Sequence, residues 1–130
     1  MLINKENELT INELYFHDAV LCDFKFDREG KSVVLTIRQW NEKSPVELNF
    51  SNVIAFDMTL ADFWGPSKHI NGCFLNDEEK RILIPTIKKR WEKESYDENF
   101  PYKDFIEIGF EFISGDYLII AFESLSISAC

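Results

Sequence analysis

Two pairs of alternating segments, each joined by a short turn that contains glycine, constrain the fold of this chain most strongly. Apolar and charged residues alternate over residues 19–27, Gly30 interrupts the pattern, and residues 31–40 alternate again. Residues 105–113 and 117–127 repeat this arrangement around a Ser-Gly-Asp turn. Alternation with a period of two around such a turn is typical of an antiparallel β-hairpin. The sequence therefore predicts two hairpins, one in each half of the chain.

Two further strands are expected between the hairpins, at residues 46–50 and 54–58, where apolar residues again alternate. The last segment, residues 117–127, is apolar on both sides, which is typical of a central strand covered on both faces. With one helical segment, these elements predict an α+β fold. We expect one curved antiparallel β-sheet of about six strands, partly barrel-like, with the helix packed against it. No repeat or linker divides the chain, so residues 1–130 are expected to form a single domain.

The helical segment is expected in residues 76–94. Its first residue, an asparagine, is a typical N-cap, and carboxylates follow near the positive end of the helix dipole. Leu83, Ile87 and Trp91 recur every four residues and form one apolar stripe. Pro85 disfavours an uninterrupted helix. The segment is therefore expected either to kink or to divide into a short first helix and a second one that Pro85 opens.

The chain is acidic, and its charge is unevenly distributed. Its net charge is −9, with 14 basic and 23 acidic residues, of which six basic and five acidic ones lie in residues 76–94. The other 8 basic and 18 acidic residues give the rest of the chain a net charge of −10. Proteins that bind nucleic acids neutralise phosphates with lysine and arginine, so we expect no nucleic acid partner. The acidic surface is interpreted either as a solubility feature or as a docking face for a basic partner.

The sequence also predicts the compartment of the protein. No apolar run approaches the length of about 20 residues that a membrane helix needs, so no membrane partner is expected. The N-terminal residues are polar and lack the apolar core of a signal peptide, which indicates a cytoplasmic location. Cys22, Cys73 and Cys130 are an odd number without metal-ligand spacing, and are expected to be reduced and mostly buried. Cys22 is assigned to the apolar face of its strand, with Phe24.

No catalytic motif stands out in the sequence. The His17–Asp18 pair occurs in metal-dependent phosphohydrolases, but those sites need more histidine ligands, and His69 is the one other histidine. The alternative interpretation is that Asp18 caps a turn that enters the first long strand. The sequence has no phosphate-binding glycine loop, no nucleophile elbow and no zinc-protease motif. We therefore expect no enzyme activity, no cofactor and no bound metal.

The candidate binding residues lie in a turn-rich segment with two aromatic side chains. They are Asp62, Phe63, Trp64, Ser67 and His69. Aromatic anchors inside a polar rim are typical of binding hot spots. The alternative is that Trp64 folds back and plugs the open end of the sheet. The sequence leaves both interpretations open.

The order of these features resembles that of small bacterial domains of the kind grouped with polymorphic-toxin immunity proteins. The resemblance rests on His17–Asp18 before a paired-strand segment, on Phe-Ser-Asn-Val at residues 50–53, on residues 62–67, and on residues 110–116 before a final apolar strand. It spans most of the chain. It implies a bacterial, cytoplasmic protein that binds a partner, and those domains have no established catalytic residues to transfer.

The leading functional prediction is therefore a non-catalytic protein-binding domain, an immunity protein that neutralises a basic toxin through its acidic surface. The alternative is a small-molecule binding domain with a pocket near Trp64 and His69. A deep pocket with convergent polar groups would favour the alternative, and a flat acidic face would favour the first prediction. The oligomeric state is left open.

Overall fold

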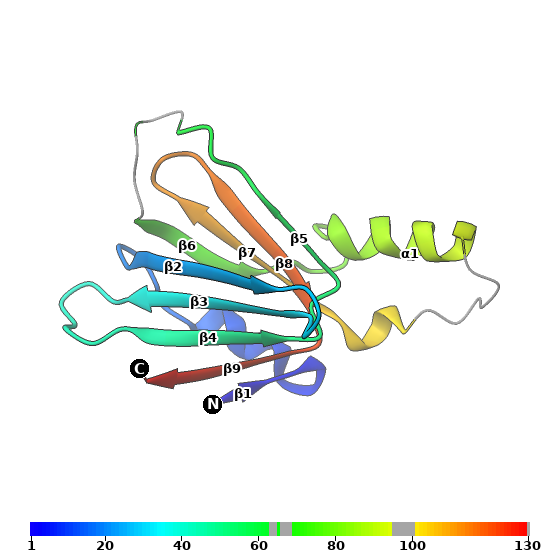
Figure 1. Cartoon of the computed structure of the whole chain (residues 1–130), viewed down its shortest axis with the longest axis horizontal. Helices are drawn as coiled ribbons and strands as arrows, with labels where there is room; N and C mark the ends of the chain where they lie inside the picture. The colour runs from blue at the N-terminus through cyan, green and yellow to red at the C-terminus, as the bar shows by residue number, and fades with distance from the viewer. Residues whose placement is uncertain (63–64, 66–68, 95–100, 130) are drawn as a thin grey trace.

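A computed structural model describes residues 1–62, 65, 69–94 and 101–129 of the chain. Among these residues, nine β-strands form two antiparallel sheets (Figure 1). The strands of the first sheet, in spatial order, are β1 (Leu2–Ile3), β9 (Ser124–Ala129), β4 (Val46–Ser51), β3 (Ser32–Arg38) and β2 (Val20–Asp27). Those of the second sheet are β5 (Ala55–Met58), β8 (Tyr117–Phe122), β7 (Ile106–Phe112) and β6 (Ile70–Leu75).

Three helical segments accompany the sheets. They are the 3-10 helix η1 (Lys5–Glu13), the α-helix α1 (Leu83–Glu94) and the 3-10 turn η2 (Tyr102–Asp104). The helix α1 extends beyond the end of the sheets in Figure 1, away from the turns that join β3 to β4 and β7 to β8. None of the helices within the described ranges is long and apolar enough to cross a membrane.

Both predicted hairpins are confirmed, and the α+β class is correct. β2 pairs with β3, and β7 pairs with β8, each in antiparallel orientation. The expectation of one sheet of about six strands, partly barrel-like, is wrong, because the strands form two separate sheets of five and four strands. Neither sheet closes into a barrel.

The division into two sheets occurs at one corner of the molecule, where the chain twice passes from one sheet to the other. Residues 51–55 lead from β4 to β5, and Glu123 separates β8 from β9. Two hydrogen bonds join these crossings. The backbone N–H of Glu123 donates to the carbonyl oxygen of Ser51 at 3.1 Å, and Asn52 Nδ2 donates to Glu123 Oε2 at 2.8 Å. What the sequence pattern presented as one long strand over residues 117–127 is therefore two strands in different sheets.

The main core lies between the two sheets. Phe50 of β4 and Phe122 of β8 meet edge to face across it, with ring centroids 4.8 Å apart. Alternate residues of β3 and β7 face this core, as their period of two predicts. Fully buried large side chains include Phe50, Phe110, Phe122, Leu35, Ile37, Leu48, Ile106, Ile108 and Leu118. The apolar faces assigned to β3 and β7 are thus confirmed.

The first turns of the helix α1 pack against one end of the outer face of the second sheet. Ile84, with Leu83 and Ile87 beside it, packs against Phe105 and Ala121 in a second apolar cluster. β8 therefore has apolar contacts on both faces, since Leu118, Ile120 and Phe122 belong to the main core. This arrangement confirms that the strand is central and that the helix is one of its covers.

The helix begins later than its sequence signals indicate. Residues 77–80 form a turn, and α1 starts at Leu83 with Pro85 inside its first turn, where a missing N–H costs no hydrogen bond. Asn76 is therefore not the N-cap. A buried carboxylate on β7, Glu107, takes that role instead.

Glu107 lies below the N-terminus of α1 and is fully buried. Its carboxylate accepts the backbone N–H groups of Ile82, Leu83 and Ile84 at 2.9, 2.8 and 3.1 Å. Asn76 Nδ2 donates to the same carboxylate at 2.9 Å. A negative group at this position satisfies N–H groups that have no partner inside the helix and complements the helix dipole.

Candidate functional site

The structure describes two of the five predicted binding residues. Phe63, Trp64 and Ser67 lie outside the described residues. Asp62 is exposed, with a left-handed backbone (φ 50°), and its N–H and C=O are both hydrogen-bonded within the chain. His69 is exposed at the start of β6. The two residues lie at the same end of the two sheets, and Asp62 lines a pocket there.

The backbone around His69 joins the sheets at this end. His69 forms an isolated antiparallel bridge with Val20 at the start of β2, and its carbonyl oxygen accepts the N–H of Ile113 at 3.0 Å. The N–H of Ile70 donates to the carbonyl oxygen of Ala19 at 2.8 Å. The beginning of β2 is therefore held against the beginning of β6, although β2 belongs to the first sheet and β6 to the second.

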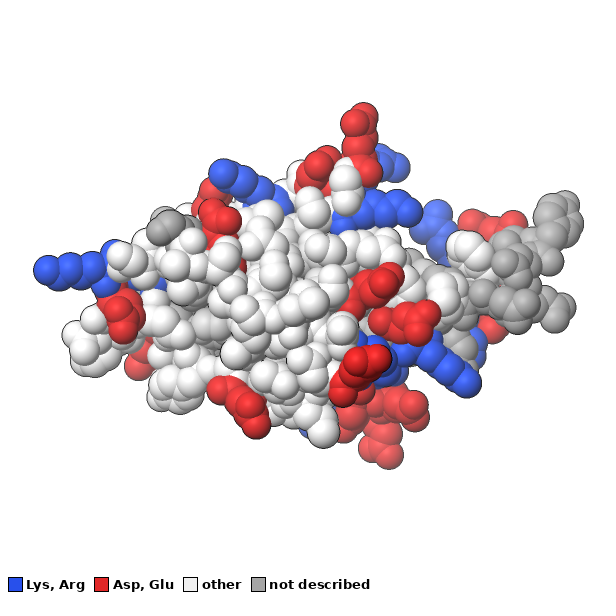
Figure 2. Space-filling model, turned by 90° about the horizontal axis from the view of Figure 1, so that it is seen from below, with Lys and Arg blue, Asp and Glu red and all other residues white. Residues whose placement is uncertain are grey.

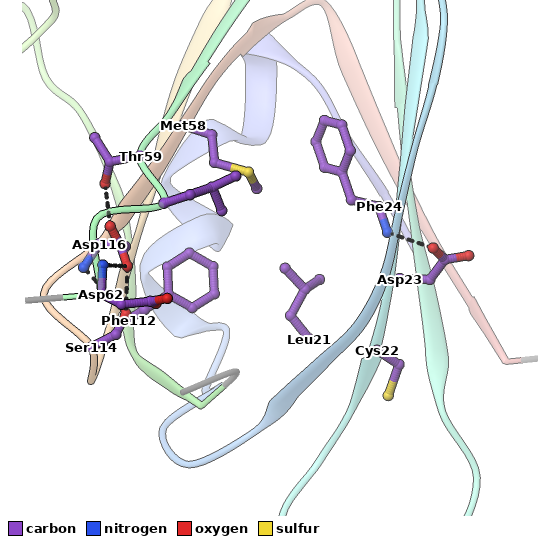
Figure 3. Close-up of a pocket in the computed structure, with 11 residues that line it drawn as sticks. Leu21, Cys22, Asp23, Phe24, Met58, Thr59, Asp62, Phe112, Ser114 and Asp116 are labelled. Atoms are coloured by element: carbon purple, nitrogen blue, oxygen red, sulfur yellow. Dashed lines mark hydrogen bonds between the residues drawn. The ribbon is translucent and has the colours of Figure 1, made fainter. Parts of the chain in front are cut away.

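A pocket of about 330 Å³ lies between β2, the segment that follows β5, and the turn between β7 and β8. In Figure 3, Leu21 and Phe24 point into it from β2, and Met58 and Phe112 point into it from the opposite wall. Cys22 and Asp23 point away from it. The interior that the pocket offers to a ligand is therefore mainly apolar.

The polar wall of the pocket is organised by Asp116, which is only 6% exposed. Its Oδ1 accepts from Thr59 Oγ1 at 2.8 Å and from the N–H of Ala61 at 2.7 Å. Its Oδ2 accepts from Ser114 Oγ at 2.9 Å and from the N–H of Asp62 at 3.0 Å (Figure 3). Burial by itself would raise the pKa of this carboxyl group, but the hydrogen bonds outweigh burial and lower the pKa from 3.8 to about 2.

Asp116 is therefore an ionised acceptor at neutral pH, and both of its oxygens are occupied by donors of the chain. It ties the segment after β5 to the β7–β8 turn and keeps the pocket wall in place. Sequence reasoning treated the Ser-Gly-Asp turn only as a hairpin signal and missed this role. A serine two residues before an aspartate in a turn was the available clue, since such side chains often bond locally.

The face assigned to Cys22 is wrong. β2 contains a bulge between Leu21 and Asp23, which leaves Cys22 without a partner residue on β3. An extra residue in one strand reverses the alternation from that point on. Leu21 therefore packs against the core together with Phe24, and Cys22 is exposed.

The other cysteines differ from Cys22. Cys73 is partly buried, and burial raises the pKa of its thiol to about 12. Cys130 lies outside the described residues. The expectation of mostly buried thiols is thus wrong for Cys22 and correct in direction for Cys73.

The His17–Asp18 pair lies in a turn that leads into β2. Asp18 has a left-handed backbone (φ 64°), and its N–H donates to the carbonyl oxygen of Ile70 at 2.8 Å. His17 Nδ1 lies 3.5 Å from Asp18 Oδ1. The predicted turn is confirmed, since the N–H of Ala19 donates to the carbonyl oxygen of Phe16 at 2.9 Å, whereas the proposed capping by the Asp18 side chain stays a prediction. Within the part of the chain that the structure describes, no three His, Cys, Asp or Glu side chains are grouped as metal ligands would be.

The fold is that of an antiparallel two-sheet α+β protein, and the mainly apolar pocket lies at one end of its sheets. Neither a protein-family model nor a curated protein matches the sequence. Among solved structures, the chain is similar to an uncharacterized protein from Neisseria gonorrhoeae. The two share 15% sequence identity with a TM-score of 0.46, over 98% of this chain and 96% of that one.

Proposed function

We propose that this chain is a non-catalytic protein-binding domain, and that its partner contacts the end of the sheets where the pocket lies. The supporting observation is a set of large apolar side chains exposed at this end. Tyr15, Trp40, Leu60 and Ile113 are 73%, 72%, 82% and 46% exposed. Single exposed apolar residues are normal on protein surfaces, whereas several at one end indicate a contact surface.

The four side chains belong to segments that are joined in two pairs. Gln39 Nε2 donates to the carbonyl oxygen of Tyr15 at 2.9 Å, which brings the segment before β2 to the β3–β4 turn that carries Trp40. The hydrogen bonds of Asp116 join the Leu60 segment to the β7–β8 turn, next to Ile113. The surface is therefore built on two pairs of loops, and hydrogen bonds hold the loops of each pair together.

The pocket supports the same proposal because it is suited to an apolar side chain of the partner. Its volume of about 330 Å³ is at the lower end of ligand pockets, which span about 300–1,000 Å³. Leu21, Phe24, Met58 and Phe112 supply apolar contacts, and the Asp116 carboxylate is already satisfied. A side chain of the partner that is buried in this pocket would be a central anchor, as is typical of a binding hot spot.

The finer proposal is that the partner is basic, as a toxin of the nuclease type would be. It rests on the net charge of −9 and on the resemblance to immunity domains. Figure 2 shows a broad uncharged area on the face seen from below, with acidic and basic side chains near one another around it. On that face the proposed attraction therefore depends on the net charge of the molecule and not on one continuous acidic patch.

The experiment that tests the proposal compares two matched variants. The tagged protein captures its partner from cells of its own source, and the captured protein is then identified and purified. Leu60→Asp places a charge on the proposed surface, whereas Ile82→Asp makes the same change at an exposed apolar residue beside the N-terminus of α1. Leu60→Asp should weaken binding at least tenfold, since one desolvated charge costs several kcal/mol. Equal affinities for the two variants would contradict the proposed contact surface.

The alternative function, binding of a small molecule, is supported by the position of Asp62 at the pocket. Asp62 and the apolar side chains of β2 and β5 converge there from different segments. A small apolar compound that binds saturably, and that Met58→Trp excludes by filling the pocket, would support this alternative. If such a compound is found and no protein partner is captured, the protein-binding proposal is wrong.

A further inference from the structure

A second hollow, of about 400 Å³, lies between α1 and the turn that joins β2 to β3. It is separate from the proposed binding surface, because it is built by the opposite ends of the strands. Its apolar lining comes from β2, from the β4–β5 connection and from α1: Phe26, Val53, Ile54, Ile87 and Trp91. Apolar side chains from three segments thus share one surface depression.

Two aromatic rings of this lining are open to solvent. Phe26 is 47% exposed and Trp91 is 37% exposed. One side of Phe26 is held by Phe56, which meets it edge to face with ring centroids 4.9 Å apart. When an apolar group covers such exposed rings, apolar surface is removed from water and the free energy of the complex is lowered.

Two cations complete the hollow. Arg28 and Lys31 line it from the β2–β3 turn, and both side chains are exposed. The turn is anchored, since the carbonyl oxygen of Lys31 accepts the N–H of Val53 at 2.8 Å and the carbonyl oxygen of Arg28 accepts the N–H of Lys31 at 3.4 Å. Neither cation forms an ion pair with any residue that the structure describes.

The carboxylates of the same turn are not part of the hollow. Asp27 and Glu29 do not line it, and the Asp27 carboxylate lies against Gly30, where a Cβ would be 2.5 Å from Oδ2. The pocket at the other end has the opposite charge, because its described lining contains Asp62 and Asp116 and no lysine or arginine. The hollow beside α1 is therefore an apolar site with a local positive charge on a molecule of net charge −9.

We propose that this hollow binds a small amphiphilic anion, a carboxylate carried on an alkyl chain or an aromatic ring. The apolar part would cover Phe26, Ile87 and Trp91 and be removed from water. The carboxylate would accept hydrogen bonds from the guanidinium of Arg28, which can bind both oxygens, and from the ammonium of Lys31. This site does not depend on the proposed protein partner.

Two fluorescent probes with nearly the same ring system test the proposal. 8-Anilinonaphthalene-1-sulfonate is anionic, and N-phenyl-1-naphthylamine is its neutral counterpart. The double variant Arg28→Gln/Lys31→Gln should bind the anionic probe about tenfold more weakly and the neutral probe unchanged, since hydrogen bonds to charged groups contribute about this factor. Trp91→Ser should weaken the binding of both probes. Octanoate should displace the anionic probe from the wild type at lower concentration than octan-1-ol does.

A matched control separates the local site from net charge. Arg38→Gln/Lys43→Gln also removes one arginine and one lysine, at exposed positions near the other end of the strands. Urea midpoints confirm that each variant is folded. The proposal is overturned if the two double variants lose equal affinity for the anionic probe. It is also overturned if Arg28→Gln/Lys31→Gln weakens both probes equally, or if Trp91→Ser leaves both affinities unchanged.

Discussion

Two buried carboxylates hold key segments of this molecule by accepting hydrogen bonds from the chain itself. Asp116 binds the segment after β5, and Glu107 binds the start of α1. Both have N–H or O–H donors on each oxygen, which is what a buried charge requires. The two residues are therefore the points at which a single substitution should have the clearest effect.

We expect Asp116→Asn to destabilise the protein in a way that depends on pH. The pKa of Asp116 is lowered from 3.8 to about 2 in the folded protein, so the ionised form stabilises the fold. This contribution is complete above the pKa of the unfolded chain and is lost as the pH falls from about 4 towards 2. Urea midpoints of wild type and Asp116→Asn should differ most at pH 6 and converge near pH 2.

The control for this experiment is Asp104→Asn, which removes an exposed carboxylate. Its difference from the wild type should be small at every pH. If the effect of Asp116→Asn were the same at pH 6 and at pH 2.5, folding would not lower the pKa of Asp116, and its ionised form would not stabilise the fold.

A second prediction for a single residue follows from the bulge in β2. In a Cys130→Ser background, Cys22 should react rapidly with a disulfide reagent such as DTNB in the native protein, because it is exposed. Cys73 should react slowly until the protein unfolds, since burial raises the pKa of its thiol to about 12. The measurement is the number of fast-reacting thiols. The absence of a fast-reacting thiol in Cys130→Ser would contradict the bulge assignment, and a fast thiol that remains in Cys22→Ser/Cys130→Ser would contradict the burial of Cys73.

At the scale of elements, β7 connects the two apolar clusters. Ile106, Ile108 and Phe110 face the main core, while Glu107 on the opposite face lies beneath the start of α1. This carboxylate therefore links the start of the helix to the second sheet, in addition to the apolar contacts of Ile84. Because α1 also lines the hollow next to the β2–β3 turn, the same carboxylate helps to position that site.

Glu107→Gln should lower the free energy of unfolding by about 2–3 kcal/mol, the usual contribution of hydrogen bonds to a charged group. The amide has one acceptor oxygen in place of two and brings N–H donors towards the N–H groups of the helix. The same substitution at the exposed Glu111, on the same strand, is the matched control and should change stability little. Urea unfolding measures both variants. Equal midpoints would mean that the carboxylate does not stabilise the start of α1.

At the scale of the whole molecule, the net charge and the exposed apolar side chains of the proposed contact surface should affect different rate constants of partner binding. Opposite charges speed encounter, and salt screens them, with a Debye length of about 30 Å at 0.01 M and about 8 Å at 0.15 M. The apolar contacts act after encounter and determine how long the complex lasts. Kinetic measurements can therefore distinguish the two contributions.

We expect the association rate constant with a basic partner to fall about tenfold between these two salt concentrations, and the dissociation rate constant to change much less. Leu60→Ala keeps the net charge and should instead raise the dissociation rate constant at both concentrations. Surface plasmon resonance with the captured partner measures both constants. An association rate that is independent of salt would contradict the role of the acidic charge.

The sequence by itself determined the local elements, because alternation with a period of two is a property of neighbouring residues. It predicted the hairpins β2–β3 and β7–β8, the apolar faces of β3 and β7, and the turn at Asp18 before β2. Asp62 and His69 lie at the same end of the sheets, and their assignment to a binding site stays a prediction. The assignment of Phe63, Trp64 and Ser67 to a binding site stays a prediction, since these residues lie outside the described structure.

Tertiary structure decided what depends on residues far apart in the chain. The pattern over residues 117–127 is the same for one strand as for two strands in different sheets, and the contact of Glu123 with Ser51 and Asn52 separates them. The start of α1 is set by Glu107, 24 residues after Leu83. The bulge at Cys22 and the pocket wall at Asp116 likewise depend on partners in other strands and turns. Such contacts produce no periodic pattern of apolar residues in the sequence, so they can be identified only in the folded chain.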